Sequence, residues 1–428
     1  MKSYWYSFGL VLAILVLCFL CPVQAAPPDA SVNAVPLLLW SGSTGSTEPM
    51  SDNAAKVSCS GDGKYVAVGY GVGIVEFRDR QGAMLWRWQS PHPYYTVWKI
   101  AVSRNGEYTG VILNDPLQDH PGWLGYFDRA GNLLWSKSMK GPFGFVALSG
   151  NGNVIALTDG ERISFFTSTG ELAGTTVLEG FPWAVALSDD GATAGISTGY
   201  DRGYIYAVGT NGTVLWSSPG GQHGLSVAIT GDGRYLAGTA SSRLRLFTIS
   251  GDRLWDFNSS PEFTGVAVSS DGAYIAASSQ YYLRLFNRSG AELWQYEVPS
   301  LPTRPGPYIG QLSMSADGSS ISVTTEGNRT LFFDREGNLL WQNESPDRVV
   351  STSLARNGKY LAIGTEQEFS YFDTGIALPA DETVPIVVAT TPAKAPVRTP
   401  THPTPVSAVV VITGICSGML LCEAKRKR

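Results

Sequence analysis

The stretch Val266–Tyr296, VAVSSDGAYIAASSQYYLRLFNRSGAELWQY, decides the fold. It predicts four short β-strands, because apolar and β-branched runs alternate with residues typical of tight turns. Asp271-Gly272 and Asn287–Gly290 supply two of the turns, since Gly, and less readily Asp and Asn, adopts the positive φ that such turns need. One four-stranded sheet of this kind has two apolar faces to bury, so it must stack on copies of itself.

The copies recur along the chain at a regular period. An Asp-Gly or Asn-Gly pair begins at Asp62, Asn105, Asn151, Asp190, Asp232, Asp271, Asp317 and Asn357, with spacings of 43, 46, 39, 42, 39, 46 and 40 residues. A propeller blade repeats every 40–45 residues or so. A second motif, Gly followed four residues later by Trp, recurs at Gly82/Trp86, Gly131/Trp135, Gly212/Trp216, Gly251/Trp255, Gly290/Trp294 and Gly337/Trp341. The two interleaved motifs predict an all-β propeller.

The number of blades follows from what is missing at the end of the array. The last repeat, Ser351–Thr374, has three strands and no Leu-Trp strand, whereas an orphan Leu-Leu-Leu-Trp occurs at Leu37–Trp40. We therefore expect eight blades of four-stranded antiparallel sheet over residues 37–376, with the N-terminal strand completing the last blade and closing the ring. The third repeat is degenerate, because Leu172-Ala173-Gly174 stands where Leu-Trp is expected.

The repeats resemble two known propeller families. TGDGRYLAGT and SSDGAYIAAS look like WD40-type repeats, and the Gly-x-x-x-Trp motif resembles the tryptophan-docking repeat of quinoprotein (PQQ-like) eight-bladed propellers. That family has an Asp four residues before the Gly, whereas Asp128 and Asp334 stand three before Gly131 and Gly337. The resemblance covers roughly residues 37–376 and implies the fold rather than an activity.

The two ends of the chain predict export and anchoring. Residues 1–26 are typical of a signal peptide, with basic Lys2, an apolar run at Gly9–Leu20 and small residues at the cleavage site; residues 27–36 form a short lead. After the ring, residues 377–405 contain seven prolines and several threonines, as an extended stalk does. Val406–Cys422 is apolar and uncharged, and residues 423–428 form a basic cytoplasmic tail.

This layout predicts a single-pass protein of the cell membrane with its propeller on the extracellular side. It is similar to that of archaeal, methanogen-type cell-surface proteins. An intact transmembrane helix at Val406–Cys422 is the favoured interpretation, and removal of the tail on covalent attachment is the alternative.

Composition restricts the partners. The chain carries −5, and the part without Lys2 and without the tail from Glu423 onward carries −9, with no basic cluster. An acidic surface argues against nucleic acid as a partner. Of five cysteines, only Cys59 lies in the ring, so no disulfide forms there, and we interpret Cys59 as a buried structural thiol.

Five Asn-x-Ser/Thr sequons make the exported part a potential glycoprotein. They begin at Asn211, Asn258, Asn287, Asn328 and Asn343. The alternative is that Asn and Ser are simply common in turns.

One face of the ring is the expected binding face. The first-to-second and third-to-fourth turns are short in every repeat, whereas the other connections carry insertions, including Ser90–Thr96, Asn114–Gly122 and Pro299–Gly310. Loops on a rigid scaffold are the usual place for binding. The residues that we select there are Tyr95, Trp98, His120, Trp183, His223 and Tyr308. Their alternative role is packing between blades, which is common for aromatic residues.

No catalytic, cofactor-binding or metal-binding residues are identified. His92, His120 and His223 come from different repeats and have no metal-ligand spacing, and Asp115, Asp119 and Asp201 do not form a calcium loop. The favoured function is a non-enzymatic surface module that binds protein or glycan partners. The alternative is a quinoprotein-like, PQQ-dependent dehydrogenase or a degenerate relative. The resemblance implies for such an enzyme a vicinal Cys-Cys disulfide, Ca²⁺ ligands and an Asp base.

Overall fold

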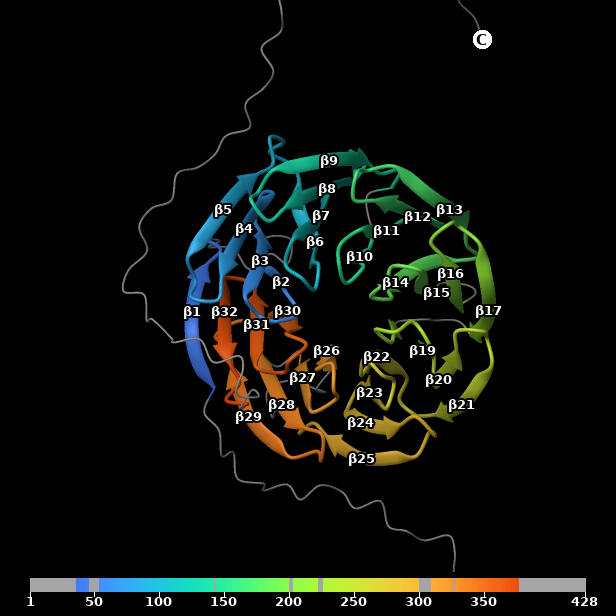
Figure 1. Ribbon diagram of the computed structural model, residues 1–428. Helices are drawn as coiled ribbons and strands as arrows, with labels where there is room; N and C mark the ends of the chain where they lie inside the picture. The colour runs from blue at the N-terminus through green and yellow to red at the C-terminus, as the bar shows by residue number, and fades with distance from the viewer. Residues whose placement is uncertain are drawn as a thin grey trace, which may run out of the picture. The chain divides into compact units, whose positions relative to one another are not determined.

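The computed structural model describes residues 36–45, 54–141, 144–199, 203–221, 226–299, 309–325 and 328–376. Eight four-stranded antiparallel sheets are arranged as blades around a central axis (Figure 1). The predicted eight-bladed propeller is therefore confirmed. The predicted stalk and membrane span lie outside the described residues, and the described part contains no helix long and apolar enough to cross a bilayer.

We number the blades in chain order and give the strands from the axis outward. Blade I contains β2 (Lys56–Cys59), β3 (Tyr65–Tyr70), β4 (Ile74–Asp79) and β5 (Met84–Gln89). Blade II contains β6 (Thr96–Val102), β7 (Tyr108–Asn114), β8 (Trp123–Asp128) and β9 (Leu133–Ser138). Blade III contains β10 (Val146–Leu148), β11 (Val154–Asp159), β12 (Arg162–Thr167) and β13 (Leu172–Val177). Blade IV contains β14 (Phe181–Leu187), β15 (Thr193–Gly199), β16 (Gly203–Gly209) and β17 (Val214–Gly221).

The second half of the ring follows the same pattern. Blade V contains β18 (Val227–Ile229), β19 (Tyr235–Ala240), β20 (Arg243–Thr248) and β21 (Arg253–Asn258). Blade VI contains β22 (Phe263–Val268), β23 (Tyr274–Ser279), β24 (Tyr282–Asn287) and β25 (Glu292–Glu297). Blade VII contains β26 (Ile309–Met314), β27 (Ser320–Thr325), β28 (Arg329–Asp334) and β29 (Leu339–Glu344). Blade VIII contains β30 (Val349–Leu354), β31 (Tyr360–Thr365), β32 (Glu368–Asp373) and β1 (Leu37–Ser43).

The ring closes through the N-terminal strand, as predicted. β1 pairs antiparallel with β32, from Leu37 opposite Asp373 to Ser43 opposite Glu368. The amide of Thr44 extends the pairing by donating to the carbonyl of Gln367 at 2.8 Å. This strand leaves blade VIII with the same four strands as its neighbours, so no blade has an open gap.

The Ser-x-Asp-Gly-x-Tyr motif, or a variant of it with one or more of these residues replaced, forms the first hairpin turn of each blade. In blade VI the Ser269 hydroxyl donates to Asp271 Oδ1 at 2.8 Å, and the same oxygen accepts the Ala273 amide at 2.9 Å. The Tyr274 amide donates to Ser269 Oγ at 3.0 Å. Gly272 has φ +69°, a conformation that side chains with a Cβ adopt rarely. The motif recurs because this compact turn is repeated in every blade.

The Gly-x-x-x-Trp motif locks each blade to the next. The indole of Trp255 in blade V donates to the carbonyl of Arg288 in blade VI at 2.9 Å. A Cβ on Gly290 would lie 2.7 Å from Cγ of Trp255, so the indole packs on the turn only because that position is Gly. The Trp of one repeat thus contacts the next blade, and the Gly of the same repeat contacts the Trp of the preceding blade. The same indole-to-carbonyl bond is made by Trp40, Trp86, Trp135, Trp216 and Trp294.

Two seams depart from this arrangement. In blade III, Gly174 pairs with Phe165 in the register at which Leu246 pairs with Trp255 in blade V, and the Asn211-Gly212 turn packs directly on it. In blade VII, the fully buried indole nitrogen of Trp341 has no hydrogen-bond acceptor among the described residues. The turn that would supply one is interrupted, because β32 and β1 of blade VIII are the two ends of the ring.

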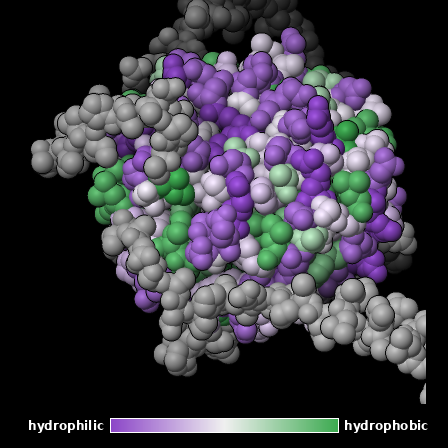
Figure 2. All heavy atoms as spheres, turned by 60° about the horizontal axis from the view of Figure 1, so that its bottom comes forward, coloured by the Kyte–Doolittle hydropathy of each residue, from purple (hydrophilic) through white to green (hydrophobic). Residues whose placement is uncertain are grey.

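Most of the core lies between blades, as the repeat pattern predicts. One cluster joins blades I and II through Phe77, Trp86, Val97 and Phe127, and similar clusters fill the other seams. The leucine before the docking tryptophan points outward instead, and Leu85 and Leu215 are about half exposed. Figure 2 shows that apolar residues form separate patches among polar ones on the face in view.

Candidate binding site in the central channel

The innermost strands of the blades surround the central channel, and irregularities in their pairing shape its mouth. Four of these strands carry one extra residue where they enter from the loop face: Trp98 in β6, Trp183 in β14, Thr264 in β22 and Val350 in β30. In β26 the irregularity involves Gly310 and Gln311. A bulge changes the direction of a side chain, and bulges are common beside binding sites.

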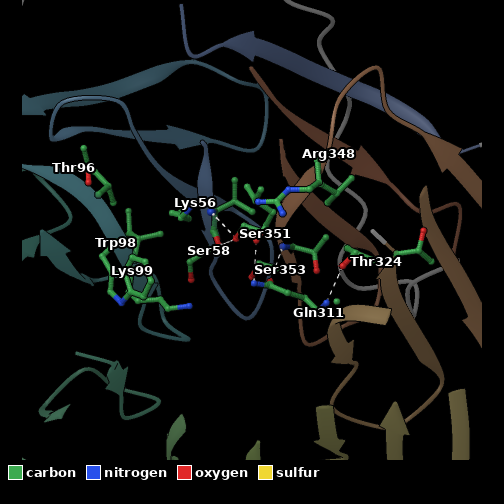
Figure 3. Close-up of a pocket in the computed structure, with 18 residues that line it drawn as sticks. Lys56, Ser58, Thr96, Trp98, Lys99, Gln311, Thr324, Arg348, Ser351 and Ser353 are labelled. Carbon is green, nitrogen blue, oxygen red and sulfur yellow. Dashed lines mark hydrogen bonds between the residues drawn. The ribbon is translucent and has the colours of Figure 1, made fainter. Parts of the chain in front are cut away.

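A pocket of about 650 Å³ lies on one side of this channel. Its walls are the starts of β2, β6, β26 and β30, together with the end of β27 and Arg348 (Figure 3). These elements belong to blades I, II, VII and VIII, which flank the point of ring closure. The volume falls in the range of small-molecule sites, roughly 300–1,000 Å³.

Three cations line the pocket. Lys56, Lys99 and Arg348 come from three different blades, and the described lining includes no Asp or Glu. Arg348 also pairs with Glu366, with Nε 3.2 Å from Oε1. The positive pocket contrasts with a chain whose net charge is −5.

Lys99 is enclosed by aromatic rings. Its Nζ lies 5.7 Å from the ring centroid of Trp98 and 5.3 Å from that of Phe145 in the next blade. Such cation–π contacts favour the ammonium form. Burial lowers the pKa of Lys99, because the charged form loses hydration inside the channel. An anion next to this amine would favour its charged form and raise the pKa of Lys99 again.

Several hydroxyl groups in the wall hold the strands together. Ser351 Oγ accepts the Val57 amide at 3.1 Å, Ser353 Oγ accepts the Cys59 amide at 3.0 Å, and Ser58 Oγ accepts the Val102 amide at 3.0 Å. These contacts link the first strands of blades VIII, I and II.

Gln311 makes the corresponding link between blades VII and VIII. Its Oε1 accepts the amide of Thr352 at 3.0 Å, and its Nε2 donates to the carbonyl of Val350 at 3.2 Å. These side chains are already engaged with the backbone and therefore contribute rigidity more than free binding groups.

Two other hydroxyls in the wall are not engaged. Oγ1 of Thr325, at the end of β27, and Oγ1 of Thr352, in β30, are buried and have no hydrogen-bond partner among the described residues. Their residues are 1% and 8% exposed, respectively, and both line the pocket. Buried polar groups are almost always hydrogen-bonded, so these two hydroxyls are exceptions in an otherwise well-bonded wall.

A ring of backbone hydrogen bonds surrounds the opposite end of the channel. The residue at the start of each first hairpin turn is bonded to its counterpart in the next blade, at 2.7–3.3 Å. The donors are the amides of Gly61, Asn105, Gly150, Asp189, Gly231, Ser270, Ala316 and Arg356. The ring returns to its starting point because the Arg356 amide donates to the carbonyl of Gly61.

Three charged side chains extend across this end. Asp189 of blade IV pairs with Arg104 of blade II and, at 3.2 Å, with Nη1 of Arg356 of blade VIII. Burial and the neighbouring Arg356 lower the pKa of Arg104 to about 9. A Cβ on Gly231 would lie 2.6 Å from Oδ2 of Asp189, so the group needs small neighbours. The pocket is therefore entered from the loop face, opposite this bridge.

The structure places the predicted binding residues in different environments. Trp98 lines the pocket. Tyr95 is only 8% exposed, packs in the seam between blades I and II, and donates to the carbonyl of Pro121 at 2.8 Å. Trp183 occupies in blade IV the bulge position of Trp98, is 40% exposed, and is not part of the described lining. His223 and Tyr308 lie outside the described residues.

His120 belongs to a small aromatic group beside the mouth. Its ring stacks on Tyr94 with centroids 4.0 Å apart, and its Nδ1 lies 2.7 Å from Oδ2 of buried Asp115. The hydrogen bond from His120 is the main cause of a lowered pKa for Asp115. Asp115 is thus an internal anchor of its loop. The described residues contain no group of three or more His, Cys, Asp or Glu side chains that could hold a metal ion.

Cys59 occupies the position predicted for a structural thiol. It is buried, unpaired and hydrogen-bonded to Ser353, and burial raises its pKa to about 11. Among the sequons, Asn211 and Asn258 are exposed, whereas Asn287, Asn328 and Asn343 are half-buried. Oδ1 of Asn287 accepts the Ala291 amide at 3.0 Å and so shapes its own turn. Glycosylation of these residues stays a prediction.

Sequence reasoning missed the cations and the unpaired threonines. A usable signal existed for the lysines, since Lys56 begins and Lys99 interrupts otherwise apolar or small-residue strands, KVSC and TVWKIAV. A charged residue in a strand buried on both faces indicates a polar cavity or a partner. No comparable signal marks Thr325 or Thr352 in the sequence.

Comparison with known proteins supports the fold. A family model, PQQ_2, described as outer membrane protein assembly factor BamB, matches residues 201–376. The C-terminal WD40 domain of Sif2 is similar with a TM-score of 0.64 at 15% identity, covering 80% of this chain and 99% of that one. The Dos1 propeller has a TM-score of 0.61 at 10% identity, covering 79% and 96%. The propeller domain of Cps50 (Swd1) from Myceliophteria thermophila has 0.51 at 11%, covering 79% and 99%.

The fold defines this chain as a β-propeller repeat protein, and the PQQ-like family model matches its residues 201–376. No curated protein matches its sequence. The similarity to the solved structures is at the level of the fold, because sequence identities of 10–15% carry no site residues with them.

Proposed function

We propose that this protein is a binding module and that its channel pocket recognises an anionic group on a protein or glycan partner. The observation that supports the proposal is the set of Lys56, Lys99 and Arg348 around one cavity, without a carboxylate in the described lining. A cluster of cations in a cleft of an otherwise acidic protein attracts ligands of negative charge.

The rigid ring favours such binding. The cations are fixed on strands whose positions are set by Ser58, Ser351, Ser353 and Gln311, so little conformational entropy is lost when a ligand enters. Inside the channel the effective dielectric constant is below that of water, which strengthens charge-assisted hydrogen bonds. Hydroxyls and an indole complete a mixed polar and aromatic wall.

The residues of the pocket do not fit the alternative quinoprotein dehydrogenase. The described lining contains no cysteine and none of the Asp or Glu ligands that would bind Ca²⁺ beside a quinone. The adjacent hydroxyls have no His or carboxylate beside them in that lining to act as a general base. Binding without chemistry is thus the function that this set of side chains supports best.

The location of the module is a separate part of the proposal. A signal peptide at residues 1–26 and a span at Val406–Cys422 would place the ring on the outer side of the membrane, with the loop-face mouth available to partners. Protease treatment of intact cells tests this part, because an outward-facing ring is cleaved from the stalk without cell lysis. Protection of the ring until lysis would contradict it.

Calorimetric titration of the full-length protein with citrate and inorganic phosphate tests the binding site. We expect binding that weakens with salt, and a loss of at least about tenfold in Lys99→Met, since a desolvated charge pair contributes 1.4 kcal/mol or more. Lys140→Met is the matched control, because Lys140 is exposed and outside the pocket. Equal affinities for the two variants, or no binding of either anion, would contradict the proposal.

A further inference from the structure

The strand that closes the ring has an apolar free edge. β1 is the outermost strand of blade VIII, and Leu37 and Leu38 at its start are 53% and 50% exposed. Its sequence, LLLWSGS, contains no charged residue and no proline. An edge strand presents backbone N–H and C=O groups that can pair with another strand, and proteins commonly protect such edges with charges or proline. β1 lacks both kinds of protection.

Six of the other seven outermost strands carry such protection. A charged residue or a proline occurs in each of them, namely Arg87 in β5, Lys137 in β9, Pro219 in β17, Arg253 in β21, Glu292 in β25 and Glu344 in β29. The seventh, β13 (LAGTTV), is uncharged like β1. The two unprotected strands differ in their surroundings, because the chain leaves the ring directly beside β1.

The point at which the chain leaves the ring is fixed by several contacts. Leu37 at the start of β1 is paired with Asp373 at the end of β32, and Lys359 Nζ donates to the carbonyl of Ile376 at 3.1 Å. Ile376 also packs against the apolar cluster that joins blades VII and VIII. The nine residues 377–385 that follow can span up to about 30 Å, whereas the free edge of β1 is about 10 Å, or two strand spacings, from β32. The next part of the chain is therefore within reach of that edge.

That next part has the sequence of a β-strand. Residues 386–391, IVVATT, lie outside the described residues; they are uncharged and mostly β-branched, and Pro385 and Pro392 bound them. Their number, six, equals the length of β5, β9, β13, β21, β25 and β29. Segments that stay in solvent are poor in β-branched apolar residues, so this run is out of place in a Pro/Thr-rich spacer.

We propose that residues 386–391 add to the free edge of β1 as a fifth strand of blade VIII. The chain leaves the ring at the end where β1 begins, so the added strand runs parallel to β1, and its apolar side chains cover Leu37 and Leu38. Main-chain hydrogen bonds along an exposed edge supply the affinity, as in other cases of strand addition. The contact protects the closing strand and ties the C-terminal segment to the ring, and it is independent of the channel pocket.

Amide hydrogen exchange on the full-length protein tests this proposal. The test variant is Val387→Pro/Val388→Pro, with both positions changed because only one of two neighbouring amides faces β1. We expect the outward-facing amides of β1 and the remaining amides of residues 386–391 to exchange at least tenfold faster in this variant than in the unmodified protein. Ala395→Pro/Val397→Pro, in the same spacer but outside the run, is the matched control and should leave exchange unchanged.

The outer edge of β13 is the internal reference, because no such segment follows it; its outward-facing amides should exchange rapidly in every variant. Exchange of residues 386–391 at the rate of a free chain in the unmodified protein would overturn the proposal. Protection of β1 that persists in the test variant would overturn it as well, because another group then covers the edge. Protection that disappears on dilution would also overturn it, since β1 then pairs with a second copy of the chain.

Discussion

The indole nitrogens of Trp294 and Trp341 provide a matched pair for testing the locking of the blades. Both side chains are buried, at 5% and 0% exposure, and both pack on a phenylalanine, Phe333 or Phe332. Nε1 of Trp294 donates to the carbonyl of Arg335 at 2.7 Å, whereas Nε1 of Trp341 has no acceptor among the described residues. Substitution by Phe removes the same atoms from both residues, but it removes a hydrogen-bonded N–H from Trp294 and an unpaired N–H from Trp341.

The magnitudes follow from those situations. Both variants lose packing, by a similar amount in each, and this loss cancels in the comparison. Trp294→Phe also loses a hydrogen bond worth about 0.5–1.5 kcal/mol, whereas Trp341→Phe removes an unsatisfied donor that costs about 1–3 kcal/mol. The second variant should therefore retain about 1.5–4.5 kcal/mol more of the free energy of unfolding.

Scanning calorimetry of the full-length variants checks this difference. A ring of roughly 340 residues has an unfolding entropy near 0.7 kcal/mol per kelvin, so 1 kcal/mol shifts Tm by about 1.4 °C. We expect Trp341→Phe to melt about 2–6 °C above Trp294→Phe. Equal melting temperatures, or a lower value for Trp341→Phe, would refute the inference that the indole–carbonyl bond locks one blade to the next.

Three further predictions concern the thiol, the bridge across the channel and the pocket lysine. Cys59, with a pKa raised to about 11 by burial, should resist alkylation by iodoacetamide at pH 8 in the folded protein and react fully in urea; prompt labelling of native protein would contradict its burial. Asp189→Asn leaves two arginines without their shared carboxylate and should lower the free energy of unfolding by about 1 kcal/mol, given the partial exposure of the three groups, whereas exposed Glu171→Gln should have no effect. Burial lowers the pKa of Lys99 below its usual 10.5, so the unfolded chain binds more protons between those two values and stability rises with pH in that window. Lys99→Met should remove this rise in urea titrations, and an unchanged pH dependence would contradict the burial of the amine.

The architecture was predictable from the sequence because every blade is built from the same short motifs. Ser269, Asp271 and Gly272 form one turn with their own hydroxyl, carboxylate and positive φ, and the same residue types recur at the period of a blade. Trp40 lies outside any complete repeat, which indicated that its strand belongs to a blade with a missing strand, and β1 completes blade VIII. Eight copies of the same short motif at the period of a blade indicate a propeller.

The pocket was much harder to predict, because no local rule brings its residues together. Lys56 and Arg348 are nearly the whole ring apart in sequence and meet only because the ring closes. Trp98 points into the channel through a bulge, which depends on the pairing of β6 with β7 and has no signature in β6 alone. Tyr95, three residues earlier, has equal aromatic character and is buried in a seam instead.

Of the loop-face residues selected from the sequence that the structure describes, Trp98 lines the channel pocket, and the cations there were not selected. Aromatic residues were a visible feature of the sequence, and Trp98 was selected among them. The cations of the first strands were hidden, because single charged residues in apolar strands have no period. A search for polar residues at the starts of the first strands would have selected Lys56 and Gln311 as well.

The pairing of Leu37 with Asp373 has a mechanical consequence. The two ends of the ring leave the structure side by side, because β1 and β32 are antiparallel and begin and end at the same edge. A force that pulls these ends apart loads one pair of residues at a time, as a zipper does, and not the whole strand in shear. The outermost strand of blade VIII should thus detach at low force and reattach when the load falls, while the other seven blades keep their shape.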